Sequence, residues 1–300
     1  MLTTAEAFTK FRSRLELNDR EQEDASRRQR EMREHMDDEF DIEHDFLTGS
    51  YARHTKTKPL KDVDIFCVLG ENERHYRHEP PGELLTAVEK ALARKYGQSC
   101  VKKQRRSVTV DFGVKPDAEE RTNYRVVSFD VVPAFTAGKN YEIPDTAANH
   151  GAGCWTKTNP TIHADKAIEA QETYSREWKG LVRMMKYWNN HHEKPIKPSF
   201  LIEVMALDLL HAPYGGDRAR EMQFFFAAIA GRIHETWEDP ARLGPPVSDS
   251  MDPGKCAVAE RALREAERQA AHAIHLTREG RQGDALKAWR ALFGPMFPLS

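Results

Sequence analysis

This sequence lacks any apolar run that approaches the roughly 18 consecutive residues of a membrane-spanning helix. Its first residues show no basic patch followed by an apolar stretch, so we expect no signal peptide. The four cysteines are scattered, and none lies two to four residues from another, which excludes the usual spacing of zinc fingers and ribbons. Scattered cysteines in a chain that is not secreted predict reduced thiols and a cytoplasmic location.

A large excess of charge of either sign is also absent. Lys and Arg total 45 against 47 Asp and Glu, which gives a formal net charge of −2. This balance argues against a protein coated in basic charge for gripping long nucleic acid, although it allows a local basic groove. The chain has 300 residues, of which 39% are hydrophobic, so it can bury a substantial core in one large domain or two smaller ones.

The order of the sequence patterns predicts an α+β chain with two lobes. Residues 5–40 contain no Gly or Pro and predict a long N-terminal helix. Apolar and alternating runs predict strands at 63–69, 107–114 and 124–132, with a helix at 83–96. Strand signals stop near residue 160, and helices are expected at 164–191, 200–210, 223–237, 255–277 and 284–293. We therefore expect a sheet lobe with the N-terminal helix in residues 1–150 and a helical lobe in residues 151–300.

Three short motifs carry the predicted chemistry: Gly49-Ser50, then Asp62 and Asp64, then Asp130. Alternation along the predicted strand puts Asp62 and Asp64 on one face. Mg²⁺ binds such carboxylates and takes substrate phosphates as further ligands. A third carboxylate, from Asp130 on another strand, would hold a second ion about 3.5–4 Å away, as in two-metal phosphoryl transfer. The Gly-Ser pair lets the backbone approach a triphosphate and offers it hydroxyl and N–H donors.

Each of these motifs has an ordinary structural explanation when taken alone. A Gly-Ser pair is common, an Asp-x-Asp sequence is usually a turn or a solvated edge, and Asp130 could cap an element or form a salt bridge. The joint arrangement favours function, because the acidic pair enters an apolar strand where unpaired carboxylates are costly, and a second apolar strand carries one more Asp.

This arrangement resembles the nucleotidyltransferase superfamily of the DNA polymerase β type. Residues 155–160, 181–188, 197–200 and 288–294 extend the likeness to the bacterial cyclic-oligonucleotide synthases related to cGAS, the CD-NTases of CBASS antiphage signalling systems. The resemblance spans roughly residues 40–295. It implies a polymerase-β-like nucleotidyltransferase lobe followed by a helical lobe that closes the nucleotide cleft.

The resemblance also implies a role for each matched position. Asp62, Asp64 and Asp130 would be the ligands of two Mg²⁺ ions, for which Mn²⁺ can substitute. Asp130 would in addition help to deprotonate the attacking ribose hydroxyl. Gly49 and Ser50 would hold the donor triphosphate.

Two further positions match in the second half of the chain. Lys186 would contact the nucleotide phosphates, and Ser199 would lie beside the donor. Lys186 is at the edge of the apolar stripe of its predicted helix, from which it could reach a cleft. Ser199 follows Pro198 in the first turn of the next predicted helix, where anions are favoured. A solvated lysine and an ordinary first-turn serine are the structural alternatives.

We therefore predict a nucleotidyltransferase that makes a cyclic di- or trinucleotide second messenger from ATP, with other nucleoside triphosphates as further candidate substrates. A template-independent RNA polymerase, a transferase that adenylylates a protein and a non-catalytic nucleotide-binding scaffold are the alternatives. RNA tailing should require a broader basic surface, and the intact acids disfavour a scaffold. Because the sequence shows no zinc-binding insertion, we expect no DNA requirement, and either constitutive activity or a protein activator, for instance of the HORMA type. The lack of a long apolar run predicts no membrane partner.

Overall fold

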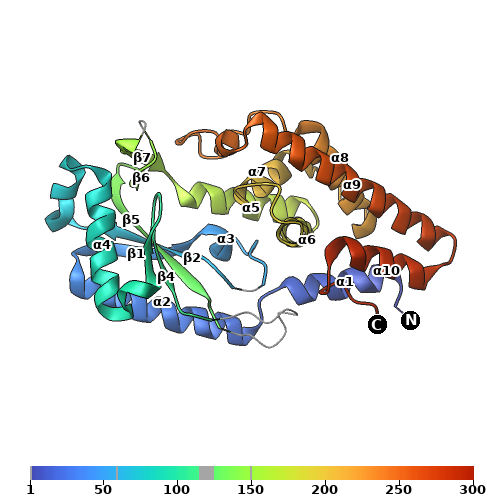
Figure 1. Cartoon of the computed structure of the whole chain (residues 1–300), viewed down its shortest axis with the longest axis horizontal. Helices are drawn as coiled ribbons and strands as arrows, with labels where there is room; N and C mark the ends of the chain where they lie inside the picture. Colours follow the sequence, from blue (N-terminus) through green and yellow to red (C-terminus); the bar gives the residue numbers. More distant parts are fainter. Residues whose placement is uncertain (1, 59, 115–124, 149–150) are drawn as a thin grey trace. The chain divides into compact units, whose positions relative to one another are not determined.

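The computed structural model describes residues 2–58, 60–114, 125–148 and 151–300 (Figure 1). The chain forms two compact units, which differ from the expected lobes. Leu17–His163 form the sheet unit, and Met1–Glu16 together with Ala164–Ser300 form the helical unit. The first helix joins the helical unit because its apolar stripe packs there, with the ring of Phe8 4.9 Å from that of Trp289.

The sheet unit contains α2 (Asp19–Glu39), β1 (Ile42–Thr48), α3 (Gly49–Ala52), β2 (Val63–Leu69), η1 (Glu71–His78), α4 (Pro81–Tyr96), η2 (Gln98–Cys100), β3 (Val101–Lys103), β4 (Val108–Asp111), β5 (Ser128–Ala137), β6 (Asn140–Asp145) and β7 (Cys154–Thr158). The strands run in the order β1-β2-β5-β4-β3, with β6 paired to β5 and β7 to β6. Strands β2 and β5 are parallel, whereas the other pairs are antiparallel. The strand expected at 63–69 and the helix expected at 83–96 are confirmed.

Alternation along β2 sorts its side chains onto two faces of the sheet. Val63, Ile65 and Cys67 enter the core that the sheet forms with α2 and α4 (Figure 1). Phe66 and Val68 belong to a smaller apolar cluster on the opposite face. Because successive side chains of a strand point to opposite faces, Asp64 shares this second face.

The helical unit contains α1 (Thr4–Leu15), most of α5 (Pro160–Thr173), α6 (Trp178–His191), α7 (Phe200–Leu209), α8 (Arg218–Arg232), η4 (Val247–Ser250), α9 (Pro253–Arg278) and α10 (Gln282–Phe293). Its helices share one apolar core, which includes the fully buried rings of Trp178, Trp188 and Trp289. The buried helix expected at 200–210 is confirmed as α7. Among the described residues, no helix has both the length and the apolar content to cross a membrane.

The single N-terminal helix expected at 5–40 is wrong, because the structure has two helices there. The carboxamide of Asn18 accepts a hydrogen bond from the Glu21 N–H, and the Glu21 carboxylate accepts one from the Asn18 N–H at 2.8 Å. This capping box satisfies N–H groups at the start of α2 and thereby begins a second helix without any Gly or Pro.

The helix expected at 164–191 is also wrong, since α5 and α6 are separate. Ser175 and Arg176, between them, have φ values of 53° and 62°, in the left-handed region that breaks a right-handed helix. Neither residue is a strong helix breaker, so the local sequence gives no clear signal of this break.

Residues 102–106 form a basic stretch, KKQRR, and part of it has a structural role. Arg105 and Arg106 both bind the carboxylate of Asp145 at the end of β6, with the nearest N···O distances at 2.5 and 2.6 Å. Burial alone raises the pKa of Asp145, but the hydrogen bonds from the two guanidinium groups outweigh it and lower the pKa to about 2. The two arginines therefore fix the β3–β4 turn to β6.

We expect Asp145→Asn to destabilise the sheet unit by about 2 kcal/mol at pH 7, because it removes the charge that both partly exposed arginines bind. The folded-state pKa lies below the ordinary value of 3.8, so this stabilisation is complete above about pH 5 and is lost as the pH falls toward 2. Urea denaturation of wild type and variant between pH 2 and 8 measures the difference. A difference that does not shrink on acidification would contradict the ionic origin of the effect.

Candidate active site

The parallel pairing of β2 and β5 brings two acids side by side. Asp64 and Asp130 are direct partners in the register, on strands whose spacing is about 4.8 Å. Both are half-buried, and both lie on the sheet face opposite α2 and α4. The next strand adds Thr109, the register partner of Asp130, whose hydroxyl donates a hydrogen bond to Asp130 Oδ1.

The two carboxylates make this edge of the sheet electrostatically unfavourable without a cation. Burial is the main cause that raises the pKa of Asp64 to about 7, and the neighbouring charge of Asp130 raises it further, against the lowering effect of Lys56 and Arg53. Burial likewise raises the pKa of Asp130, although the hydrogen bond from Thr109 opposes it. The site therefore favours either a proton or a bound cation near these oxygens.

Asp62 does not lie on the strand, which corrects the expected alternation. It precedes β2 with a φ of 51°, and its side chain is 62% exposed. Its backbone N–H donates to the hydroxyl of Ser128, which in turn donates to Asp62 Oδ1, each at 3.0 Å. The charge of Asp62 contributes to raising the pKa of both Asp64 and Asp130. Asp62 therefore remains close to the other two acids.

Gly49 packs directly against the first acid of the pair. It has a φ of 65°, and a Cβ added there would lie 1.7 Å from Asp64 Oδ2. The register explains this closeness, because Thr48, which precedes Gly49, is the partner of Asp64 across β1 and β2. The backbone conformation therefore favours glycine, and the Asp64 carboxylate occupies the space that a Cβ would need. Ser50 follows in α3 and is half-buried.

Basic side chains surround the acids unequally. Arg53 and Lys56 lie near enough to lower the pKa of Asp64, and the Lys56 ammonium is 3.9 Å from Asp62 Oδ2. Lys58 instead pairs with Glu21 of α2 at 3.1 Å. The segment after α3 therefore brings positive charge to the acid pair, although only part of it is directed there.

The donor set at this edge fits a hard divalent cation, because it consists of carboxylate oxygens that lie together and are half-buried. Asp64 and Asp130 could bind such an ion as they stand in the register. Asp62 would have to turn from Ser128 to join them. Within the described ranges, no three His, Cys, Asp or Glu side chains are already grouped as a metal site.

The two predicted residues of the second half lie in the helical unit. Lys186 on α6 is buried, at 4% exposure, and donates to Glu203 Oε1 on α7 at 2.5 Å. The solvated lysine that was the structural alternative is therefore excluded. Ser199 is exposed, precedes the first residue of α7 and makes no side-chain capping hydrogen bond to that helix.

The sequence analysis did not identify Thr109 and Glu203, which contact two of the predicted site residues. Thr109 gives no sequence signal, because only the strand register places it against Asp130. Glu203 does give a signal: it is an acid in an otherwise almost wholly apolar helix, and a buried acid needs a partner.

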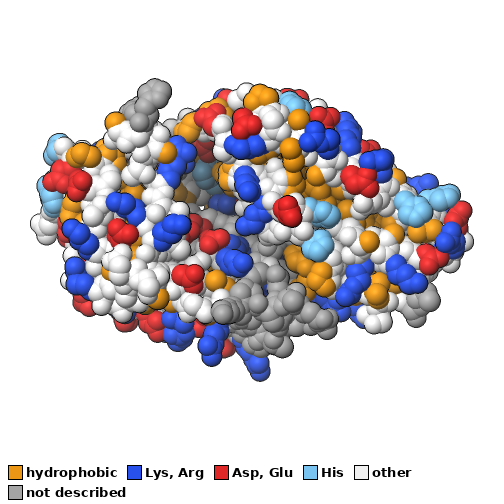
Figure 2. Space-filling view, in the orientation of Figure 1, with side chains coloured by type: hydrophobic (Ala, Val, Ile, Leu, Met, Phe, Trp, Pro, Cys, Tyr) orange, Lys and Arg blue, Asp and Glu red, His pale blue; other side chains and the backbone are white. Residues whose placement is uncertain are grey.

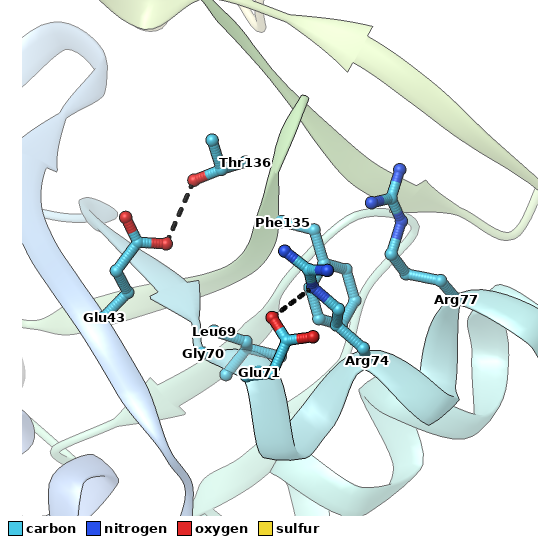
Figure 3. A pocket seen from close by; sticks show the side chains of 8 residues that line it. All are labelled: Glu43, Leu69, Gly70, Glu71, Arg74, Arg77, Phe135 and Thr136. Carbon is cyan, nitrogen blue, oxygen red and sulfur yellow. Dashed lines mark hydrogen bonds and ion pairs between the residues drawn. The ribbon is translucent and has the colours of Figure 1, made fainter. Parts of the chain in front are cut away.

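A pocket of about 250 Å³ lies at the other end of β2 and β5 (Figure 3). The acid pair precedes it by five residues along β2, which is about 17 Å of extended strand. The charged side chains of the pocket already have partners, since Glu71 binds Arg74 at 2.9 Å and Glu142 binds Arg77. The pocket is therefore distinct from the acid pair. It is lined by Glu43, Leu69, Gly70, Glu71, Arg74, Arg77, Phe135 and Thr136.

The described side chains on the face seen in Figure 2 intersperse Lys and Arg with Asp and Glu. A broad basic surface, which RNA tailing would favour, is absent from the described residues of that face. This agrees with the formal net charge of −2.

Comparison with known proteins adds a family and several relatives. Residues 1–170 match the family described as "Second Messenger Oligonucleotide or Dinucleotide Synthetase domain" (SMODS). The chain is 26% identical over 284 residues to a "probable cyclic nucleotide synthase" of Bacillus cereus, covering 83% of this chain and 81% of the relative. It is 27% identical over 278 residues to the "cyclic AMP-AMP-AMP synthase" of an Acinetobacter species, covering 86% and 73%.

Solved structures show the same fold. The structure of Escherichia coli MS115-1 CdnC with ATP has a TM-score of 0.71 to this chain at 18% identity, covering 99% of each chain. The same protein in complex with HORMA-deltaN has a TM-score of 0.70 at 18% identity, covering 98% of each. The expected α+β nucleotidyltransferase fold is thereby confirmed.

We expect Gly49→Ala to lower the free energy of unfolding by about 1–3 kcal/mol more than the matched variant Gly138→Ala. Gly138 has nearly the same φ, 64° against 65°, but a Cβ there meets nothing within 4 Å. The difference between the two variants isolates the collision with Asp64 from the cost of the backbone conformation. Equal losses in urea denaturation would show that Asp64 moves aside freely.

Proposed function

The chain belongs to the Second Messenger Oligonucleotide or Dinucleotide Synthetase family, and we propose that it makes a cyclic di- or trinucleotide from ATP, alone or with other nucleoside triphosphates. As a member of this family, it is an enzyme of the nucleotidyltransferase class that forms cyclic oligonucleotides. The observation that carries the finer proposal is the half-buried pair of Asp64 and Asp130, held against Gly49 where the backbone can approach a phosphate.

We assign Mg²⁺ to this pair, with Asp62 as the third ligand and Mn²⁺ as a substitute. Oxygen-only donors suit Mg²⁺, which keeps sites open for substrate phosphates. When bound, two such ions stabilise the charge on the attacking and leaving oxygens of an in-line displacement. The raised pKa of Asp64 supports this assignment. A bound cation would neutralise the buried carboxylate charge beside Asp130, as a proton does.

The residues of the chain position the reacting groups and move one proton. In each step a ribose hydroxyl would attack an α-phosphate and release pyrophosphate. Asp130 would accept the hydroxyl proton, while Thr109 holds Oδ1 in place by its hydrogen bond. Gly49 and Ser50 would bind the donor triphosphate through backbone N–H groups and the hydroxyl.

In the helical unit, Lys186 and Ser199 would bind phosphate oxygens of the nucleotide. Ser199 supports this role by its exposure at the start of α7, where the helix dipole favours anions. The names of two similar proteins support ATP as a substrate, since one is a cyclic AMP-AMP-AMP synthase and the other was solved with ATP.

We also propose a setting for the enzyme. The complex of E. coli CdnC with HORMA-deltaN supports an activating protein of the HORMA type, and the sequence gives no reason to require DNA. A role in antiphage signalling follows from the resemblance to the CD-NTases. All four cysteines are free thiols, which supports a cytoplasmic location.

With purified protein, Mg²⁺ and all four labelled ribonucleoside triphosphates, we expect a phosphatase-resistant product with the mass of a cyclic di- or trinucleotide. Mass spectrometry after phosphatase treatment identifies its bases and ring size. The variant Asp62→Asn/Asp64→Asn should lose at least about a thousandfold in rate and remain folded, because it removes ligands but little volume. Linear, phosphatase-sensitive chains would instead indicate a polymerase, and wild-type rates in the variant would remove these acids from the site.

The metal assignment can be tested without turnover. In EDTA, Asp64→Asn should melt at a higher temperature than wild type at pH 8, because it removes one of two adjacent carboxylates. Addition of Mg²⁺ should raise the melting temperature of the wild type and have little effect on the variant. Asp38→Asn, which removes an exposed carboxylate of α2, is the control and should respond to Mg²⁺ like the wild type. An equal response of all three proteins would contradict a site at Asp64.

A further inference from the structure

One lysine of the sheet unit lies among the acids of the candidate active site. The side chain of Lys56 is 14% exposed, and its ammonium is 3.9 Å from Asp62 Oδ2. Its charge also lowers the pKa of Asp64 and of Asp130, so it acts on all three carboxylates. A largely buried ammonium therefore occupies the same edge of the sheet as the acids to which we assign the metal ions.

The backbone around Lys56 is fixed by its neighbours. The N–H of Thr55 donates a hydrogen bond to the carbonyl of Ser50 at 3.0 Å, which returns the chain to α3. Thr55 and Thr57, on either side of the lysine, are 0% and 5% exposed. The two buried threonines anchor the segment, so the position of the Lys56 side chain beside the acids is set by the fold and not by a mobile surface loop.

A positive charge at this place affects the empty site and the occupied site differently. Without a metal ion, the ammonium offsets part of the repulsion between the carboxylates, and it repels a divalent cation that approaches the same oxygens. A nucleoside triphosphate brings several negative charges, which offset both the ammonium and the cation. Mg²⁺ commonly binds through one or two carboxylates together with substrate phosphates, which is the combination that this charge arrangement favours.

We propose that Lys56 couples metal binding to nucleotide binding: its ammonium competes with a divalent cation for the carboxylates of Asp64 and Asp130 until a nucleoside triphosphate arrives. This inference rests on the proposed function, because it takes these acids as the metal site and a nucleoside triphosphate as the second ligand. The lysine thereby makes the empty enzyme a weak metal binder, so that ion and nucleotide bind together.

The first test measures Mn²⁺ binding to the full-length protein without nucleotide, from the loss of the free Mn²⁺ signal in electron paramagnetic resonance. Lys56→Met keeps most of the side-chain volume but removes the charge, so it should bind Mn²⁺ about tenfold more tightly than the wild type. Adding Asp64→Asn to Lys56→Met should abolish the gain, because the gain arises at that carboxylate. Unchanged or weaker Mn²⁺ binding by Lys56→Met would overturn the inference.

The same titration with a saturating non-hydrolysable ATP analogue tests the coupling. The advantage of Lys56→Met over the wild type should fall below about twofold, because the triphosphate supplies the negative charge that offsets Lys56. Titration of the analogue alone gives the Mn²⁺ that it binds in solution. An equal advantage with and without the analogue would show that Lys56 does not link the two ligands.

Matched variants separate this effect from a general change in charge. Lys61→Met removes the same charge from an exposed lysine of the same segment, and it should bind Mn²⁺ like the wild type. An equal gain in Lys61→Met would contradict a local role of Lys56. Lys56→Gln is the second variant if Lys56→Met folds poorly, and it should show the same gain. Mg²⁺ should also raise the melting temperature of Lys56→Met more than that of the wild type.

The inference and the proposed function fail in different ways. Tighter, Asp64-dependent Mn²⁺ binding in Lys56→Met, without any cyclic product from the wild type, would reject the reaction but keep the competition between lysine and metal. Cyclic product from the wild type, with equal Mn²⁺ affinities of wild type and Lys56→Met, would keep the reaction and reject the role of Lys56.

Discussion

Parallel pairing of β2 with β5 places two carboxylates side by side, and the nearby charges of Lys56 and Arg53 offset only part of the cost of bringing them together. Asp64 and Asp130 are register partners on one face of the sheet, and both are half-buried. Such a pair is unfavourable in the protein alone, which the raised pKa of each acid expresses. The same two negative charges attract a cation, whose binding would neutralise the repulsion between the carboxylates.

Neighbouring elements are fitted to that pair. Gly49 allows the chain to turn against the Asp64 carboxylate, where any Cβ would collide. Thr109 occupies one oxygen of Asp130 from the adjacent strand. The odd-numbered residues of β2 pack with α2 and α4, so the strand that carries Asp64 is held firmly from its other face. The apolar core of the sheet unit thereby supports a polar edge that could not be stable alone.

The helical unit also contains charged side chains in a largely apolar environment. Lys186 and Glu203 are charges inside an apolar interface, and they are paired instead of crowded. Two adjacent half-buried acids in one unit and a buried lysine in the other are both features that stability alone would not select. In each unit, the departure from a purely apolar interior coincides with residues that we assign to nucleotide binding.

Much of the fold class could be predicted from local patterns, which also drew attention to the acids. Apolar runs located β2, α4 and α7, and Asp64 within an apolar strand was recognisable as a costly and therefore informative residue. Local patterns failed where a side-chain cap or backbone dihedral decides the outcome. Asn18 and Glu21 begin α2 inside a helical pattern, and Ser175 breaks another helix with a positive φ.

Which residues contact one another depends on the packing of the whole chain. The pairing of Asp64 with Asp130 joins residues 66 positions apart, and strand register is set by packing over the whole sheet. The position of Asp62 outside the strand, the contact of Thr109 and the burial of Lys186 against Glu203 depend likewise on contacts distant in sequence. Periodicity fixes the face of an element on which a side chain lies, whereas its partner is fixed by the element that packs there.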